Sequence, residues 1–128
     1  AFHRAFDMSN DLNKALETII DLGFVRILTS GGKENAEVGA NEIAKLILQA
    51  SERIEIMPGA GINADNLTKI ARITGAESFH TTAKSIVSSK MQFKNATSKM
   101  GNSNADEFNF EQTDINKVRV LKELLNNL

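Results

Sequence analysis

The sequence contains no cysteine, no long apolar run and no excess of charge of either sign. The absence of cysteine excludes disulfide bonds, thiolate metal sites and a cysteine nucleophile within these residues. The 15 basic and 16 acidic side chains leave a formal charge of −1, which argues against nonspecific binding to nucleic acid. No apolar stretch approaches the roughly 20 residues of a membrane span, and no leader resembles a signal peptide. We therefore expect a cytoplasmic protein that binds neither nucleic acid nor membrane.

The sequence does contain an alternation of short apolar runs and amphipathic stretches, repeated four times. The runs have strand character, and the stretches carry apolar residues at helical spacing. The expected strands are 2–6, 25–28, 54–57 and 77–80, and the expected helices are 11–22, 36–48, 64–71 and 115–125. Strands that alternate with helices in this way predict right-handed βαβ units, a parallel sheet and an α/β fold. The length of 128 residues fits one small domain.

The most informative joint is the segment 54–63, in which an apolar run leads through Gly59 and Gly61 into the expected helix at Ala64. The two glycines let the backbone turn sharply, and Asn63 is placed to cap the helix. Backbone N–H groups at such a joint point outward with the helix dipole behind them, so a phosphate or carboxylate is a natural ligand. A tight turn without any ligand fits the same pattern.

Four motifs occur in an order and spacing that resemble the CutC family, the copper homeostasis proteins. They are FHRAFD at 2–7, RILTSG at 26–31, IMPGAGI at 56–62 and FH at 79–80. The resemblance runs the length of the chain and implies a (β/α)8 TIM barrel. Residues 1–128 would form its last four β/α units, the C-terminal half of a single barrel domain. The chain begins inside the first of these strands without an initiator methionine, so we expect a fragment of a longer protein.

If the chain is half of a barrel, we expect it to associate with another chain or segment. Four parallel strands leave two edges unpaired and expose the inward apolar layer. We expect either the missing N-terminal half or self-association to close the barrel.

Barrel geometry gathers the motifs into one region, because ligands of this architecture bind at the C-terminal ends of the strands. Side chains alternate along a strand, so His3 and Asp7 are expected to point inward from the first strand. Arg26 and Glu55 fall at a similar depth on neighbouring strands. We predict that these two side chains form an ion pair with a structural role.

The candidate catalytic residues are His3, Asp7 and His80. The two histidines are the only ones in the chain, and each is a candidate general base, metal ligand or hydrogen-bonded packing residue. Asp7 is a candidate acid or a partner that orients His3, or it helps to begin a helix. The candidate anion-binding residues are Gly59, Gly61, Ile62 and Thr81, and the other mouth residues are Arg4, Thr29 and Ser30.

Copper is the ligand that the resemblance implies, but few of its preferred donors are present. Cu(I) favours thiolate and thioether ligands. Met57 lies at the right depth and His80 lies on the rim, so these two are the metal-ligand candidates. The remaining methionines, Met8, Met91 and Met100, fall in expected loops or at helix starts. A copper site formed wholly within this half is therefore the less favoured interpretation, and the missing half is a further source of ligands.

Residues 91–110 follow neither period and predict a long loop after the last strand. Lys84, Lys90 and Lys94 would bring positive charge to the mouth there, or they are solvated lysines.

Two functions follow from the sequence. The resemblance implies a copper homeostasis protein that binds copper. The residues favour a barrel that binds a small phosphorylated or otherwise anionic metabolite, and this barrel would be an enzyme if His3, Asp7 or His80 supplies acid–base chemistry.

Overall fold

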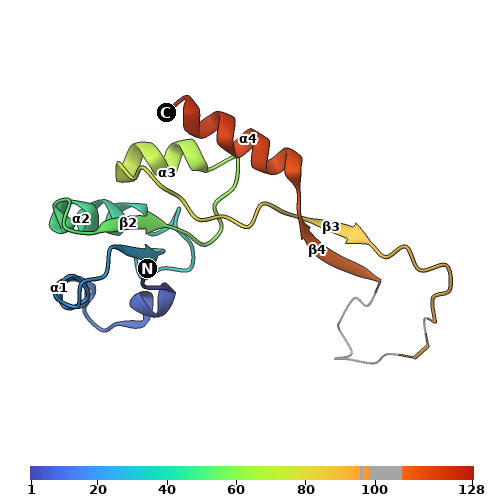
Figure 1. The fold of residues 1–128 in the computed structure, drawn as a ribbon, viewed down its shortest axis with the longest axis horizontal. Coiled ribbons are helices and arrows are strands. Elements are labelled where there is room, and N and C mark those ends of the chain that lie inside the picture. The colour runs from blue at the N-terminus through green and yellow to red at the C-terminus, as the bar shows by residue number, and fades with distance from the viewer. Residues whose placement is uncertain (96, 99–107) are drawn as a thin grey trace.

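The computed structural model describes residues 1–95, 97–98 and 108–128 of the chain. Helices and strands alternate through most of it, as the sequence predicts for an α/β fold (Figure 1). The elements are η1 (Arg4–Met8), α1 (Leu12–Asp21), β1 (Arg26–Thr29), α2 (Ala40–Ala50), β2 (Glu55–Pro58), α3 (Leu67–Thr74), β3 (Lys84–Ser88), β4 (Asn109–Thr113) and α4 (Ile115–Asn126). None of the helices in these described ranges is long and apolar enough to cross a membrane.

The parallel pair β1 and β2 forms the centre of the fold, in a register that sets Ile27 opposite Ile56. On the other side of β1, Phe2 forms an isolated parallel bridge with Ile27. On the other side of β2, the amide of His80 donates to the carbonyl of Pro58 at 2.9 Å. Four extended segments therefore follow one another side by side in the order of the chain.

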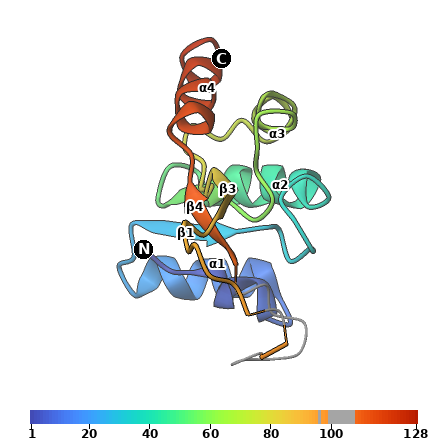
Figure 2. The same cartoon turned by 90° about the vertical axis from the view of Figure 1, so that its right-hand side faces the viewer.

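The helices cover one side of this sheet and bury its apolar side chains. Alternation along β1 and β2 buries Ile27 and Ile56 against the helices, with 0% and 4% exposed. The core that they join also contains Phe6, Leu16, Ile19, Ala36, Ile43, Leu46, Ala50, Ile54, Ile62, Leu67, Ile70 and Leu121. Figure 2 shows α1 and α4 at opposite ends of this body, with α3 next to α4.

Two of the expected helices are found almost as predicted, because their ends carry clear signals. The carboxylate of Asp11 accepts from the amide of Lys14 and caps α1. The carboxylate of Asp114 accepts from the amide of Asn116 in the first turn of α4.

The expected strand 2–6 is wrong beyond Phe2, since residues Arg4–Met8 form a 3-10 turn. The side chain of His3 accepts from the amide of Ala5, and Asp7 is held by the end of β1, so this segment bends away from the sheet. The expected strand 77–80 is also wrong, because the structure assigns no strand there and its backbone contact with β2 is the single bond of His80.

Two helices begin later than predicted. Helix α2 begins at Ala40 and not at residue 36, because residues 31–39 form bends and turns. Gly39 precedes α2, and a Cβ at this position would lie 1.8 Å from the carbonyl oxygen of Ser30, so only glycine fits. Helix α3 begins at Leu67 and not at Ala64, because the side chain of Asn63 accepts from the amide of Asp65 and closes a turn there.

The sequence did not predict the antiparallel hairpin of β3 and β4, which extends away from the body (Figure 1). Part of the expected loop 91–110 is instead the start of β4 at Asn109. Residues 96 and 99–107 of that loop lie outside the described residues.

Candidate functional site

The carboxylate of Asp7 lies at the centre of a cluster that joins η1 to the end of β1. Its Oδ1 accepts from Thr29 Oγ1 at 2.5 Å and from the Gly32 amide at 3.0 Å. Its Oδ2 accepts from Arg4 Nε at 2.8 Å and lies 3.0 Å from Ser30 Oγ. The amide of Ser30 reaches both oxygens, at 3.1 and 3.0 Å. Four of the predicted mouth residues, Arg4, Asp7, Thr29 and Ser30, are therefore brought together.

The cluster keeps Asp7 ionised. Burial raises the pKa of Asp7, but hydrogen bonds from Thr29, Arg4, Gly32 and Ser30 together outweigh it and hold the pKa below its usual value of 3.8. With 5% of its side chain exposed, Asp7 is an ionised acceptor whose two oxygens are fully engaged. This geometry favours a role in holding the chain over a role as an acid.

His3 lies beside this cluster but does not face it. Its Nδ1 accepts from the amide of Ala5 at 3.0 Å, and its ring stacks on Phe2 with 5.6 Å between the ring centroids. Nδ1 is therefore engaged as an acceptor within the chain, and the side chain is exposed. Asp7 is turned toward Arg4 and β1, so it does not orient His3.

His80 lies at the end of β2, apart from the Asp7 cluster. A Cβ added to Gly59 would lie 2.5 Å from Leu28 Cδ1 and 3.2 Å from the Cβ of His80. The glycine therefore allows the segment of His80 to approach the sheet. The imidazole itself is exposed.

The predicted ion pair of Arg26 and Glu55 is confirmed. Nε of Arg26 lies 2.5 Å from Oε2 of Glu55, and their side chains are 44% and 37% exposed. The hydroxyl of Ser78 donates to the other carboxylate oxygen. The Ser78 hydrogen bond, and then that of Arg26, hold the pKa of Glu55 below its usual value.

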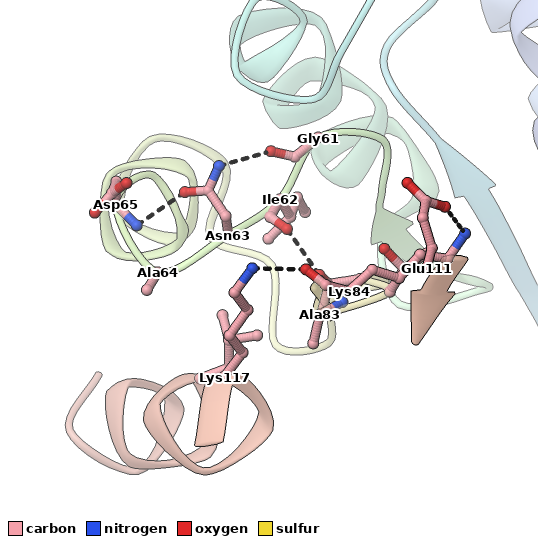
Figure 3. A pocket seen from close by; sticks show the side chains of 12 residues that line it. Gly61, Ile62, Asn63, Ala64, Asp65, Ala83, Lys84, Glu111 and Lys117 are labelled. Carbon is pink, nitrogen blue, oxygen red and sulfur yellow. Dashed lines mark hydrogen bonds and ion pairs between the residues drawn. The ribbon is translucent and has the colours of Figure 1, made fainter. Parts of the chain in front are cut away.

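A cleft of about 540 Å³ opens where β2 runs into α3 (Figure 3). Its walls come from this joint, from the segment before the hairpin, from β4 and from α4. The lining residues are Gly61, Ile62, Asn63, Ala64, Asp65, Thr81, Thr82, Ala83, Lys84, Glu111, Lys117 and Leu121. Three of the predicted anion-binding residues, Gly61, Ile62 and Thr81, therefore line one cavity.

Side chains hold the backbone of this joint from both sides. Gly61 has a φ of +74°, which favours glycine, and its carbonyl accepts from Asn66 Nδ2 at 2.9 Å. The carbonyl of Ile62 accepts from Thr81 Oγ1 at 2.7 Å. The fourth predicted anion-binding residue, Gly59, donates its amide to the carbonyl of Thr29 at 2.9 Å, so this N–H is already engaged within the sheet.

Two lysines line the cleft, Lys84 from the hairpin and Lys117 from α4, and Figure 3 shows Lys117 pointing toward the backbone of Lys84 and Lys84 pointing toward Glu111. Lys117 Nζ donates to the carbonyl of Lys84 at 2.6 Å, and Lys84 Nζ lies 2.8 Å from Glu111 Oε2. The sequence suggested Lys84 but not Lys117 or Glu111. Glu111 was missed because the hairpin strands show no apolar alternation that distinguishes them from a loop, and Lys117 was missed because the pattern of α4 does not show which element its polar side faces.

Metal donors are sparse in this part of the protein. Among the described residues, no three histidine, aspartate or glutamate side chains gather as a metal-binding group. Met57 is half-buried on β2, and His80 lies in the segment beside that strand. The thioether of Met57 and the imidazole of His80 are ligand types that copper favours, so these two residues stay the candidates.

Comparison with known proteins connects this fold to one family. The model of the CutC family matches residues 1–85. The copper homeostasis protein cutC homolog of Homo sapiens is 45% identical over 128 residues, which are 99% of this chain and 47% of that protein. The family protein CutC of Parabacteroides distasonis is 49% identical over 91% of this chain and 49% of that protein. This chain therefore spans about half the length of these curated relatives.

A solved structure agrees with these matches. The crystal structure of a CutC protein from Streptococcus agalactiae is 37% identical in sequence to this chain and aligns with a TM-score of 0.58. The alignment covers 62% of this chain and 40% of that one.

Proposed function

This chain belongs to the CutC family, and on that basis we propose that it is the C-terminal half of a (β/α)8 barrel that serves in copper homeostasis. The observation that carries the proposal is the family match, together with a length about half that of the relatives. We also propose a cytoplasmic location, with which a cysteine-free sequence agrees.

The order of the extended segments supports the half barrel. Phe2, β1, β2 and the segment of His80 are neighbours in the order of the chain, as successive strands of a barrel are. Helices lie on the side where Ile27 and Ile56 are buried. The opposite side carries Arg26 and Glu55, and we assign it to the barrel interior.

Copper would be the cargo of this protein, and this half supplies few ligands for it. We propose Met57 as a thioether donor and His80 as an imidazole donor, with further ligands from the N-terminal half. A Cu(I) site needs several converging soft donors, so neither residue would hold the ion alone.

Competition for Cu(I) against a chromophoric chelator, with the full-length protein, tests this role. We expect stoichiometric binding that Met57→Leu and His80→Ala each weaken by at least tenfold. The matched controls Met91→Leu and His3→Ala, at exposed positions, should leave the affinity unchanged. Absence of Cu(I) binding, or equal loss in the control variants, would remove Met57 and His80 as ligands.

The cleft at Gly61 supports a second function, an anion-binding barrel that acts on a small phosphorylated metabolite. The observation that favours it is that Lys84 and Lys117 line the same cavity as the joint of Gly61 and Ile62. An anion there would meet the positive charge of Lys117, whereas the hydroxyl of Thr81 already donates to the carbonyl of Ile62 and the ammonium group of Lys84 already faces Glu111.

Titration calorimetry with inorganic phosphate tests the second function. We expect weak saturable binding that Lys117→Met reduces by about fivefold, which corresponds to about 1 kcal/mol. Arg119→Met, at an exposed cation on the same helix outside this cleft, is the control. If phosphate does not bind, or if both variants weaken it equally, the cleft is not an anion site.

A further inference from the structure

The hairpin of β3 and β4 has little support from the body of the protein. Its sheet contains these two strands alone within the described part of the chain, and the ribbon points away from the helices (Figure 1). A two-stranded hairpin in water is at best marginally stable, and further strands or a packed helix are needed to fix it.

The hydrogen bonds at the two ends of the hairpin show which backbone groups face outward. Ser89 donates to the carbonyl of Phe108, and Asp114 donates to the carbonyl of Ala83. Because antiparallel pairs alternate, the amide and carbonyl of every second residue point toward the partner strand. Ser85 and Val87 therefore face β4 with their backbone groups, and Lys84, Ile86 and Ser88 face away from it.

One contact agrees with this assignment. The carbonyl of Lys84, which the alternation points outward, accepts from Lys117 Nζ at 2.6 Å and not from β4. The backbone amide and carbonyl of Ile86, at the centre of β3, also point away from β4, and no other strand among the described residues pairs with them.

The middle of this edge lacks the usual protection against strand pairing. Natural edge strands are blocked by proline, by inward charges or by lysine at their centre. The centre of β3 is instead Ile86, an isoleucine with 76% of its surface exposed. The one lysine of the strand, Lys84, stands at its start, where its ammonium group is paired with Glu111.

We propose that β3 pairs edge to edge with β3 of a second copy of this chain, to form a four-stranded antiparallel sheet in the order β4, β3, β3, β4. The two-fold axis would pass beside Ile86, so that the two Ile86 residues exchange both backbone hydrogen bonds. This register opposes all five residues of β3, Lys84 to Ser88, and the carbonyl of Lys84, which already accepts from Lys117, would accept from Ser88 of the other copy through its second lone pair.

Charge favours a second copy as the occupant of this edge. In the symmetric register each Lys84 faces Ser88 of the other copy, and Ser85 faces Val87, so no two like charges are opposed. The two exposed isoleucines cover each other at the centre. An isologous contact of this kind closes on itself and gives a dimer.

Single cysteines introduced into the cysteine-free 128-residue chain test this pairing directly. Opposed residues of a hydrogen-bonded antiparallel pair lie about 5.5 Å apart between Cα atoms, within the range of a disulfide. Oxidation of Ile86→Cys with diamide should therefore convert most of the chain to a disulfide-linked dimer. Gln112→Cys is the matched control on β4, because the two β4 strands would lie three strand spacings, about 14 Å, apart.

Light scattering provides the second measurement. Ile86→Lys should remove this contact and halve the mass of any dimer that depends on it, toward the 14.0 kDa of one chain. Circular dichroism would check that the variant keeps its helices. The proposal is overturned if Ile86→Cys cross-links no faster than Gln112→Cys, or if the unmodified chain is a monomer at the concentration of the cross-linking experiment.

Discussion

Asp7 and Ser30 lie 23 positions apart in the sequence, and the carboxylate of Asp7 is within hydrogen-bond distance of both the amide and the hydroxyl of Ser30. The contact closes the first turn of the chain onto the end of β1. Asp7, which the sequence suggested as a catalytic residue, therefore acts here as a hydrogen-bond acceptor that holds the fold.

Asp7→Asn should destabilise the protein by about 2–4 kcal/mol. The amide would keep one acceptor oxygen but turn an NH₂ group toward Arg4 and the Ser30 amide, which are both donors. Urea unfolding at pH 7 measures the loss. Asp65→Asn, at an exposed carboxyl group, is the matched control and should change stability by less than about 0.5 kcal/mol.

The pH dependence of stability gives a second test of the same cluster. The pKa of Asp7 is lowered in the folded state, so its contribution is present above its usual value of 3.8 and is lost as the pH falls through the folded value. We expect stability to decrease below about pH 4, and Asp7→Asn to flatten that decrease. Equal acid sensitivity of the two proteins would contradict this role.

Glu17 should titrate far below an ordinary glutamate. Hydrogen bonds from Arg53, and next from Gln49, hold the pKa of Glu17 at about 2. An NMR titration of its side-chain carboxyl would measure this value directly. Arg53→Met should raise the pKa toward 4.5, whereas Arg72→Met, on α3, should not move it. A midpoint near 4.5 in the unmodified protein would show that the ion pair is absent in solution.

Glu55→Gln should cost less than about 1 kcal/mol in the 128-residue chain, because both partners of its ion pair with Arg26 are more than one-third exposed. In a closed barrel the same side chains would point into the interior, and breaking the pair would cost about 3–5 kcal/mol. Urea unfolding of the variant in the chain and in the full-length protein compares the two cases. Equal costs would argue against the interior position that we assign to this pair.

Gly61→Val should reduce both stability and phosphate binding. The φ of +74° is strained for a β-branched residue, and the new Cβ would lie 3.2 Å from that of Asn35. We expect a loss of about 2–3 kcal/mol in unfolding experiments. Gly61→Ala is the milder comparison at the same position. A valine variant with native stability and native phosphate affinity would remove the role of this joint.

The sequence predicts the parts of this fold in which local and tertiary preferences agree. Helices α1 and α4 carry a capping aspartate and an apolar stripe, and β1 and β2 are apolar on their buried side. The ion pair of Arg26 and Glu55 follows from strand alternation together with the parallel order of neighbouring strands.

The features that were missed depend on contacts between distant residues. The turn at Arg4–Met8 forms because the end of β1 donates hydrogen bonds to Asp7. No pattern in the local sequence predicts this turn. The hairpin has no buried residue, so its strands show no apolar alternation. The contact of Lys117 with the carbonyl of Lys84 joins α4 to the hairpin, which the sequence did not predict.

The half barrel is the central claim, and mixing the chain with its complement tests it most directly. The chain, in the Ile86→Lys background, would be combined with the N-terminal half of the human relative, and light scattering and thermal unfolding would be recorded. We predict a one-to-one complex with a single cooperative melt and a Tm well above that of the chain alone. A chain that is by itself a well-folded 14.0 kDa monomer, with a cooperative melt that the added half does not change, would contradict the account.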